Sequence, residues 1–220
     1  MKLITYDDIK KDNEINVYIQ KGNDLLDVLG YTDHGSGHTI KVAEAAANIL
    51  LKLGYHERTA ELARIAGYMH DIGNMINRNE HAQTGAMMAF SILERMGMEP
   101  AELADVVAAI GNHDEDCGVA VNPVSAALII GDKTDVRRTR VRNSDITSFD
   151  IHDRVNYAVG ESMLIIDDLK NITLNLEIDD SICAVMEYFE IFLTRMLMCR
   201  KAADFLDMNF HLIINKIKIM

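Results

Sequence analysis

The stretch Tyr68-Met69-His70-Asp71-Ile72-Gly73-Asn74 places a histidine and an aspartate side by side at the end of an apolar helical run. Imidazole nitrogens suit borderline transition metals, and a carboxylate has two oxygens with which it can bridge two ions. Considered alone, the stretch is explained equally well by a helix that ends in polar residues, with Gly73 as its C-terminal stop. The rest of the chain has to decide between these two interpretations.

Outward from this stretch, the spacing of apolar residues predicts a mainly helical chain. Glycines and prolines at the expected positions mark many of the helix ends. Residues 5–29 are predicted to form one or two helices, with Gly22 as the candidate break. Further helices are predicted over residues 36–53, 57–71, 81–96, 100–112 and from 122 to about 132.

The composition shifts near residue 144. Val155, Tyr157 and Val159 alternate with polar residues, as do the apolar residues of 172–178, and residues 167–171 between them resemble a turn. This pattern predicts a small antiparallel β-hairpin, followed by a long helix over about 181–208. We therefore expect a mainly α fold, with a helical metal-binding domain over 1–144 and an α+β appendage over 145–220. No ligand cluster is expected in the appendage.

The composition excludes several classes of function. The formal net charge of -12 opposes non-specific binding to nucleic acid or to an anionic membrane. The three cysteines, Cys117, Cys183 and Cys199, are widely spaced and form no CxxC pair, which favours a reducing compartment. Residues 1–8 contain no uninterrupted apolar segment, so no signal peptide is expected. We expect a cytoplasmic protein without a membrane span.

Several predicted helix ends present groups that can bind metals. They are His38, His70 with Asp71, His81, His113 and Asp132. A single helical histidine is usually structural, but four imidazoles and two carboxylates in a chain of eight histidines form a suitable ligand set for two ions, with Asp71 as the bridge. This set suits divalent Mn, Fe, Co, Ni or Zn. His34, in the preceding glycine-containing loop, is a candidate to cap or line that loop.

The order His38 … His70-Asp71 … Asp132 resembles the H…HD…D signature of the HD-domain superfamily of metal-dependent phosphohydrolases. The segments His70-Asp71-Ile72-Gly73 and 131–135 match as well, and the resemblance covers about residues 30–142. It implies a helical core whose helices converge on the metal site. His81 and His113 are similar to the extra histidines of the two-metal members.

Two departures from related sequences bear on the substrate. Asn74 stands where many members of the superfamily have a lysine, so that lysine's role in holding a phosphate is not carried over. The chain also lacks the paired HHE and the GYP element of the HD-GYP type, so a cyclic dinucleotide is not the expected substrate.

The resemblance implies a phosphohydrolase that cleaves a phosphoester of a nucleotide or other small phosphorylated metabolite through a metal-activated water. Asp71, Lys133 and Arg137 are the candidate catalytic residues. Lys133 and Arg137 lie one helical turn apart and could face the same phosphate. Arg140 and Arg142 are expected to form a solvated basic face. Residues that could assist the ligands or transfer protons are Asp114, Glu115 and Asp135.

Two other functions fit the same residues. A mixed-valence di-iron oxygenase on the same scaffold would share the six-ligand set, and iron content with oxygen consumption would identify it. A sensor that uses the pocket without catalysis would not need every ligand. The expected partner is a small phosphorylated substrate, with no nucleic-acid polymer and no membrane. We expect the appendage to serve homodimerisation, with covering of the pocket as the alternative.

Overall fold

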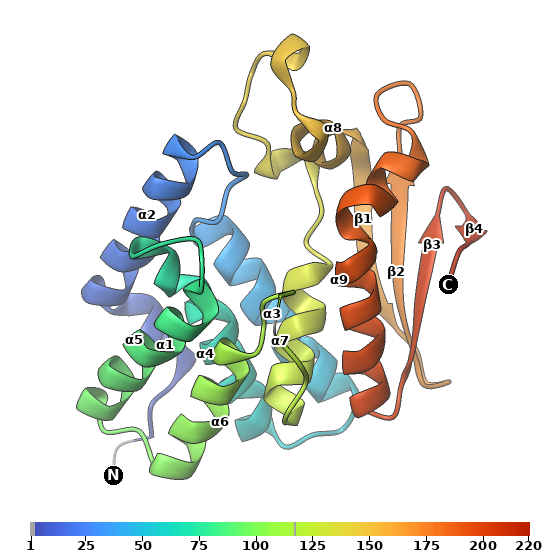
Figure 1. Ribbon diagram of the computed structural model, residues 1–220. Coiled ribbons are helices and arrows are strands. Elements are labelled where there is room, and N and C mark those ends of the chain that lie inside the picture. Colours follow the sequence, from blue (N-terminus) through green and yellow to red (C-terminus); the bar gives the residue numbers. More distant parts are fainter. Residues whose placement is uncertain (1–2, 117) are drawn as a thin grey trace.

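The computed structural model describes residues 3–116 and 118–220, so the expectations for Met1, Lys2 and Cys117 lie outside the described residues. Figure 1 shows a group of helices joined on one side to a small sheet. The helical part contains α1 (Tyr6–Lys11), α2 (Asn13–Val28), α3 (Ser36–Lys52), α4 (Glu57–Met69), η1 (Ile72–Met75), α5 (His81–Met96), α6 (Pro100–Gly111) and α7 (Pro123–Lys133).

The break within the first predicted helical segment lies at Asp12 rather than at Gly22. Asp12 has an extended backbone, and its side chain accepts a hydrogen bond from the Ile15 amide at the start of α2. Gly22 lies inside α2, where a Cβ would come within 3.0 Å of the backbone nitrogen of Met75. The glycine therefore allows α2 to pack closely against η1, which directly follows Asp71.

Small residues bring the backbones of α3, α4 and α7 together in the core. A Cβ added to Gly67 of α4 would lie 2.7 Å from the Cα of Ala43 in α3. A Cβ added to Gly131 of α7 would lie 3.1 Å from the carbonyl oxygen of Val42. These approaches place the end of α4, the end of α7 and the start of α3 at one point in the protein.

The remaining elements are η2 (Arg138–Arg140), η3 (Ile146–Ser148), α8 (Ile151–Ala158), β1 (Val159–Ile166), β2 (Asn171–Ile178), α9 (Val185–Phe205), β3 (Asn209–Ile214) and β4 (Ile217–Lys218). β1 and β2 form the predicted antiparallel hairpin, in which Ile166 pairs with Ile172. The tail adds β3, which runs parallel to β2, and β4, which completes the sheet order β1-β2-β3-β4. A parallel pair needs a long crossover, and α9 provides it.

One part of the predicted hairpin is wrong, because residues 155–158 belong to α8. The Asp150 side chain accepts a hydrogen bond from the Asp153 amide and caps this helix. Val155 and Ala158, which lie three residues apart, are both fully buried. Over so short a segment, the alternation of Val155, Tyr157 and Val159 fits either a strand or a helix, and the cap together with tertiary packing favours the helix.

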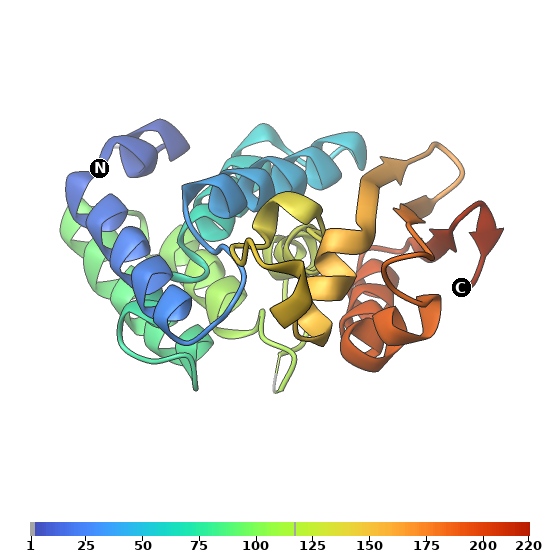
Figure 2. The same cartoon turned by 90° about the horizontal axis from the view of Figure 1, so that it is seen from above.

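α9 connects the sheet to the helical core. It packs against α7 on one side and against β3 on the other, and the view from above in Figure 2 shows it between the helices and the strands. The mainly α fold with a C-terminal hairpin and a long helix is thus confirmed, and the sheet is larger than expected. A domain boundary near residue 144 stays a prediction. Over residues 3–116 and 118–220, no helix is long and apolar enough to cross a bilayer.

The close approach of α4 to α3 can be tested with Gly67→Ala. We expect this variant to lose about 1–3 kcal/mol of unfolding free energy, because the new methyl group overlaps the Ala43 backbone. Urea denaturation followed by circular dichroism would measure the loss. The matched control is Gly37→Ala in α3, where nothing lies within 4 Å of an added Cβ. Equal stability of the two variants would contradict the proposed contact.

Candidate metal centre

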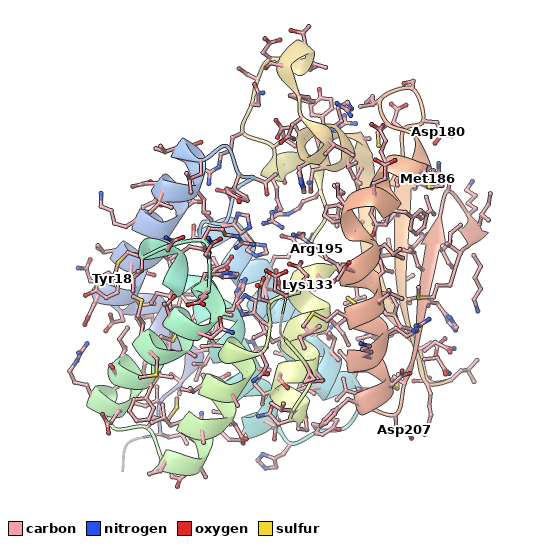
Figure 3. The ribbon with its side chains drawn as sticks, viewed as in Figure 1. Tyr18, Lys133, Asp180, Met186, Arg195 and Asp207 are labelled. Atoms are coloured by element: carbon pink, nitrogen blue, oxygen red, sulfur yellow. The ribbon has the colours of Figure 1, made fainter. Side chains whose placement is uncertain are left out.

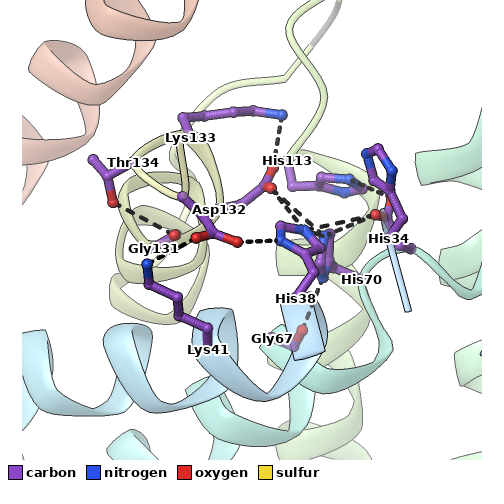
Figure 4. A network of polar contacts seen from close by, with 12 residues as sticks. His34, His38, Lys41, Gly67, His70, His113, Gly131, Asp132, Lys133 and Thr134 are labelled. Carbon is purple, nitrogen blue, oxygen red and sulfur yellow. Dashed lines mark hydrogen bonds and ion pairs between the residues drawn. The ribbon is translucent and has the colours of Figure 1, made fainter. Parts of the chain in front are cut away.

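The helix ends deliver the six candidate ligands to one buried location. His38 lies in the first turn of α3, His70 and Asp71 follow α4, and Asp132 lies in the last turn of α7. His81 begins α5, and His113 follows α6. The four imidazoles and Asp71 are buried, and the Asp132 side chain is 12% exposed. Figure 4 shows several of these side chains converging from different helices.

The first part of the cluster consists of residues at the start of α3 and at the ends of α4 and α7. The Nε2 atoms of His38 and His70 lie 3.3 Å apart. His70 Nε2 lies 3.3 Å from Asp71 Oδ2, and His38 Nε2 lies 3.4 Å from Asp132 Oδ1. The donor atoms of His38, His70 and Asp71 all lie within 4.8 Å of one another, which is close enough to surround one ion.

The second part of the cluster lies on the other side of Asp71. The Nε2 atoms of His81 and His113 lie 3.1 Å apart. Asp71 Oδ1 lies 3.4 Å from His81 Nε2 and 3.9 Å from His113 Nε2. The two carboxylate oxygens of Asp71 therefore face two different histidine pairs. A further group of donors, formed by His70, His113 and Asp132, links the two parts.

The second nitrogen of each histidine ring has a hydrogen-bond acceptor of its own. The Nδ1 atoms of His70, His81 and His113 donate to backbone carbonyls three residues earlier, at 2.8, 3.0 and 2.6 Å. The Nδ1 of His38 donates to Asp135 Oδ2 at 2.8 Å. These bonds place the proton on Nδ1 and leave the Nε2 lone pair for a metal. Facing lone pairs at 3.1–3.3 Å repel unless a cation lies between them, so this donor set fits divalent ions.

Burial and the neighbouring charges favour the metal-binding protonation states of His113 and Asp132, whereas Asp71 raises the pKa of His70. Burial, together with cationic neighbours such as Lys133, holds the pKa of His113 well below its usual value. Burial raises the pKa of Asp132, but the nearby charge of Lys133 and the adjacent imidazoles of His38 and His70 outweigh this effect and hold it well below its usual value. Neutral imidazoles and ionised carboxylates are the forms that bind metals.

Two residues outside the ligand set fix the orientation of its members. Asp135 accepts the His38 hydrogen bond and also contacts Lys41 Nζ at 2.9 Å. Burial raises the Asp135 pKa, but the His38 bond and nearby cations outweigh it and keep the pKa below the usual range. Asn74, at the position of the expected lysine, is buried and donates to Asp71 Oδ1 at 2.8 Å. It therefore holds the carboxylate that the two histidine pairs share.

The structure places Lys133 at the site but not Arg137. Lys133 is buried, with Nζ 2.8 Å from Asp132 Oδ2 and 3.3 Å from Glu115 Oε1. Burial lowers its pKa, but these two carboxylates outweigh burial and raise it, so Lys133 is a cation. α7 ends at Lys133, so the expected helical turn does not continue to Arg137. Arg137 instead contacts Asp135 and Thr139. It is not one of the residues that line the small pocket at the cluster, called the metal pocket below, which are His34, Asp71, Arg78, His81, His113, Asp132, Lys133, Arg140 and Arg195.

The expected solvated basic face is wrong for Arg140. Its side chain is only 4% exposed, and it lines the metal pocket. Arg142 is also partly covered, because its guanidinium contacts Asn23 and Asp27. The chain after α7 turns back over the loop at 31–34, where the Asp33 amide donates to the Arg140 carbonyl oxygen. This long-range contact buries a segment that is strongly polar in sequence.

Two arginines that the sequence did not single out also reach the pocket. Arg78 NH1 lies 3.8 Å from Asp71 Oδ1 and 3.4 Å from Asn74 Oδ1. Its position three residues before His81 was a usable signal. Arg195, from α9, has its Nε 2.5 Å from Glu115 Oε1 and lines the same pocket. Nothing in the sequence marks Arg195, because α9 lies beyond the segment that carries the ligands.

The protein is thus a helical protein with a cluster of four histidines and two aspartates that could hold metal ions. The sequence profile of the HD domain matches residues 35–172, which is more than half of the chain. The chain therefore belongs to the HD domain family, a family of metal-dependent hydrolases that bind divalent metals.

Two known proteins are similar to this chain. Uncharacterized protein MJ1020 of Methanocaldococcus jannaschii is 28% identical over 160 residues, which are 62% of this chain. The match spans 61% of that relative's length. A crystal structure of a predicted HD superfamily hydrolase from an uncultured Thermotogales bacterium is 25% identical, with a TM-score of 0.44. That alignment covers 56% of this chain and 67% of the other.

The number of ions can be tested by elemental analysis of protein purified without chelator. We expect about two ions per chain in the wild type and about one in His81→Ala. The reason is that His81 belongs only to the donor group formed by Asp71, His81 and His113. His152→Ala, which removes an exposed histidine outside the cluster, serves as the control. One ion in both wild type and His81→Ala would remove His81 from the site.

The orienting role of Asp135 can be tested with Asp135→Asn. Replacing this buried acceptor weakens the hold on the His38 ring, so we expect metal affinity to fall about 10- to 100-fold. Competition with a fluorescent chelator measures the affinity, and the exposed Asp204→Asn is the control. Unchanged affinity in Asp135→Asn would show that His38 needs no support from Asp135.

Proposed function

We propose that this protein is a metal-dependent phosphohydrolase that cleaves a phosphoester of a nucleotide or other small phosphorylated metabolite. The observation that carries the proposal is the division of the Asp71 carboxylate. Its Oδ2 lies 3.3 Å from His70 Nε2, and its Oδ1 lies 3.4 Å from His81 Nε2. One carboxylate between two histidine pairs supports two neighbouring ions, an arrangement that suits the displacement of a group at phosphorus.

Each residue has a distinct part in this proposal. His38, His70, Asp71 and Asp132 would hold one ion, and Asp71, His81 and His113 would hold the other. Bound divalent ions would supply a water molecule of lowered pKa and positive charge opposite the phosphate. The fixed Nδ1 hydrogen bonds hold the imidazoles in place, so the ligands need little rearrangement when substrate binds.

The surroundings of the cluster favour an anionic substrate. Lys133, Arg78, Arg140 and Arg195 all line the metal pocket. Such a set of cations within a chain of net charge -12 concentrates positive potential at one location. Because the cluster is buried, these charges act in a medium that screens them less than water does. Lys133 is placed to neutralise charge near Asp132, and Arg137 acts indirectly by holding Asp135.

The proposed partner is a small phosphorylated molecule rather than a nucleic-acid polymer or a membrane. The net charge of -12 supports this restriction, since a large acidic surface repels other polyanions while a small anion can enter a cationic pocket. A homodimer through the C-terminal segment also stays a proposal. The arginine that α9 contributes to the pocket supports the alternative role of the segment, which is covering the site.

The function can be tested by measuring inorganic phosphate released from nucleotides and other phosphomonoesters by metal-loaded protein. We expect Asp71→Asn to reduce the rate by about a hundredfold or more, because the amide is neutral and cannot serve both histidine pairs. The exposed Asp24→Asn should retain wild-type activity.

Two results would contradict the proposal. One is an unchanged rate of phosphate release in Asp71→Asn. The other is a wild-type protein that releases no phosphate from any substrate, carries iron, and consumes oxygen in the presence of an organic compound. The second result would establish the di-iron oxygenase instead.

A further inference from the structure

A cavity of about 320 Å³ adjoins the metal pocket. One wall is the loop over residues 29–34, and the other is formed by residues of α8 and α9. The cavity and the metal pocket share four lining residues, which are His34, Arg78, Arg140 and Arg195. Figure 3 shows Arg195 near Lys133 in the centre of the molecule, between the helical core and α9. The shared residues form the boundary between the candidate ligands and the cavity.

Arg140 is a buried cation that forms no ion pair with a carboxylate of residues 3–116 and 118–220. Its Nε donates to the Asp33 carbonyl oxygen and its NH1 to the Asp135 carbonyl oxygen, both at 2.9 Å. The carboxylates of Asp135, Asp132 and Asp71 act on its charge only from beyond ion-pair distance, and burial lowers its pKa. A buried charge is costly unless an opposite charge accompanies it. The position of Arg140 on the boundary therefore points to an anion that is bound there.

Arg195 and Arg78 reach the same boundary from other elements, and aromatic rings support both. The Arg195 guanidinium lies 4.8 Å from the centre of the Phe192 ring, and its Nε contacts Glu115. The Arg78 guanidinium lies 5.6 Å from the centre of the Tyr31 ring. Stacked guanidinium groups lose little freedom when they bind an anion, and their planar donors match phosphate oxygens.

The far wall of the cavity is polar. Asn156 of α8 is buried, and its Nδ2 donates to the His152 carbonyl oxygen at 2.9 Å. Its side-chain oxygen accepts no hydrogen bond from any residue in 3–116 or 118–220. A side-chain oxygen that lines a cavity and has no donor among the described residues is suited to accept a hydrogen bond from a ligand. Hydroxyl and amino groups are the donors that would satisfy it.

Resting on the proposed function, we propose that Arg140 and Arg195 bind the phosphate of a phosphomonoester whose polar body occupies this cavity. The body carries a hydroxyl or amino group that donates to Asn156, and its size is limited by the cavity of about 320 Å³. The C-terminal segment thereby selects the substrate, because α8 and α9 supply Asn156 and Arg195. The helical core would then supply the metal ligands.

The anion site can be tested without hydrolysis, by calorimetric titration of the metal-loaded protein with inorganic phosphate. We expect Arg140→Ala and Arg195→Met each to weaken phosphate binding about 10- to 100-fold, with the metal content of the wild type. Arg95→Ala, which removes an exposed guanidinium paired with Glu14, should bind phosphate like the wild type.

The two variants also separate binding from folding. Because Arg140 bonds two backbone carbonyls, we expect its loss to lower stability, whereas the loss of Arg195, which is 25% exposed, should leave the core intact. Thermal melting of each variant checks this difference. Phosphate affinity in Arg195→Met equal to that in Arg95→Ala would overturn the proposed phosphate site. Phosphate binding that depends on the arginines, in a protein that hydrolyses no phosphoester, would support the anion site and contradict only the proposed function.

The cavity wall is tested with Asn156→Leu. This variant should raise KM about tenfold for nucleoside monophosphates or sugar phosphates, whose bodies carry hydroxyl groups, because their hydrogen bond to the Asn156 side-chain oxygen is lost. Its KM for phenyl phosphate and its affinity for inorganic phosphate should stay near those of the wild type. Equal changes in KM for all these substrates, or none, would overturn the assignment of the cavity to the substrate body.

Discussion

The carboxylate of Asp71 is the point on which the rest of the site depends. Each of its oxygens faces a different pair of histidines, and the Asn74 amide holds it in place. Four imidazoles and two carboxylates packed closely together are unfavourable on their own, since lone pairs and like charges face one another. The core supplies the scaffold that enforces this arrangement, because the contact of Gly67 with Ala43 fixes where α4 ends relative to α3.

Much of the ligand set could be predicted from the sequence because its determinants are local. The apolar period, the Pro100 start and the Gly97 stop define where helices begin and end. A histidine at such an end lies where backbones converge, and the structure brings all six candidate ligands together. The mainly α fold followed for the same reason. The roles of the individual side chains as ligands stay predictions until metal is measured.

The parts that could not be predicted depend on contacts between distant segments. Arg140 looked like a solvated residue, yet its bonds to Asp33 and Asp135 carry it into the pocket. Arg195 reaches Glu115 only because α9 packs on α7. The parallel pairing of β2 with β3 joins segments separated by a whole helix, and no local pattern specifies such a pairing. Polar residues that become buried through tertiary packing keep the sequence signature of surface residues.

The position of β3 near the end of the chain has a consequence for the nascent protein. All six candidate ligands precede residue 133, whereas β3, which pairs with β2 and packs against α9, lies at Asn209–Ile214. During synthesis all six of these residues therefore emerge before α9 and β3 do. The set of arginines that lines the metal pocket, Arg78, Arg140 and Arg195, is completed last, when α9 packs against α7. In the proposed function, the metal ligands are thus complete in the growing chain before Arg195, which is proposed to bind the substrate, is made.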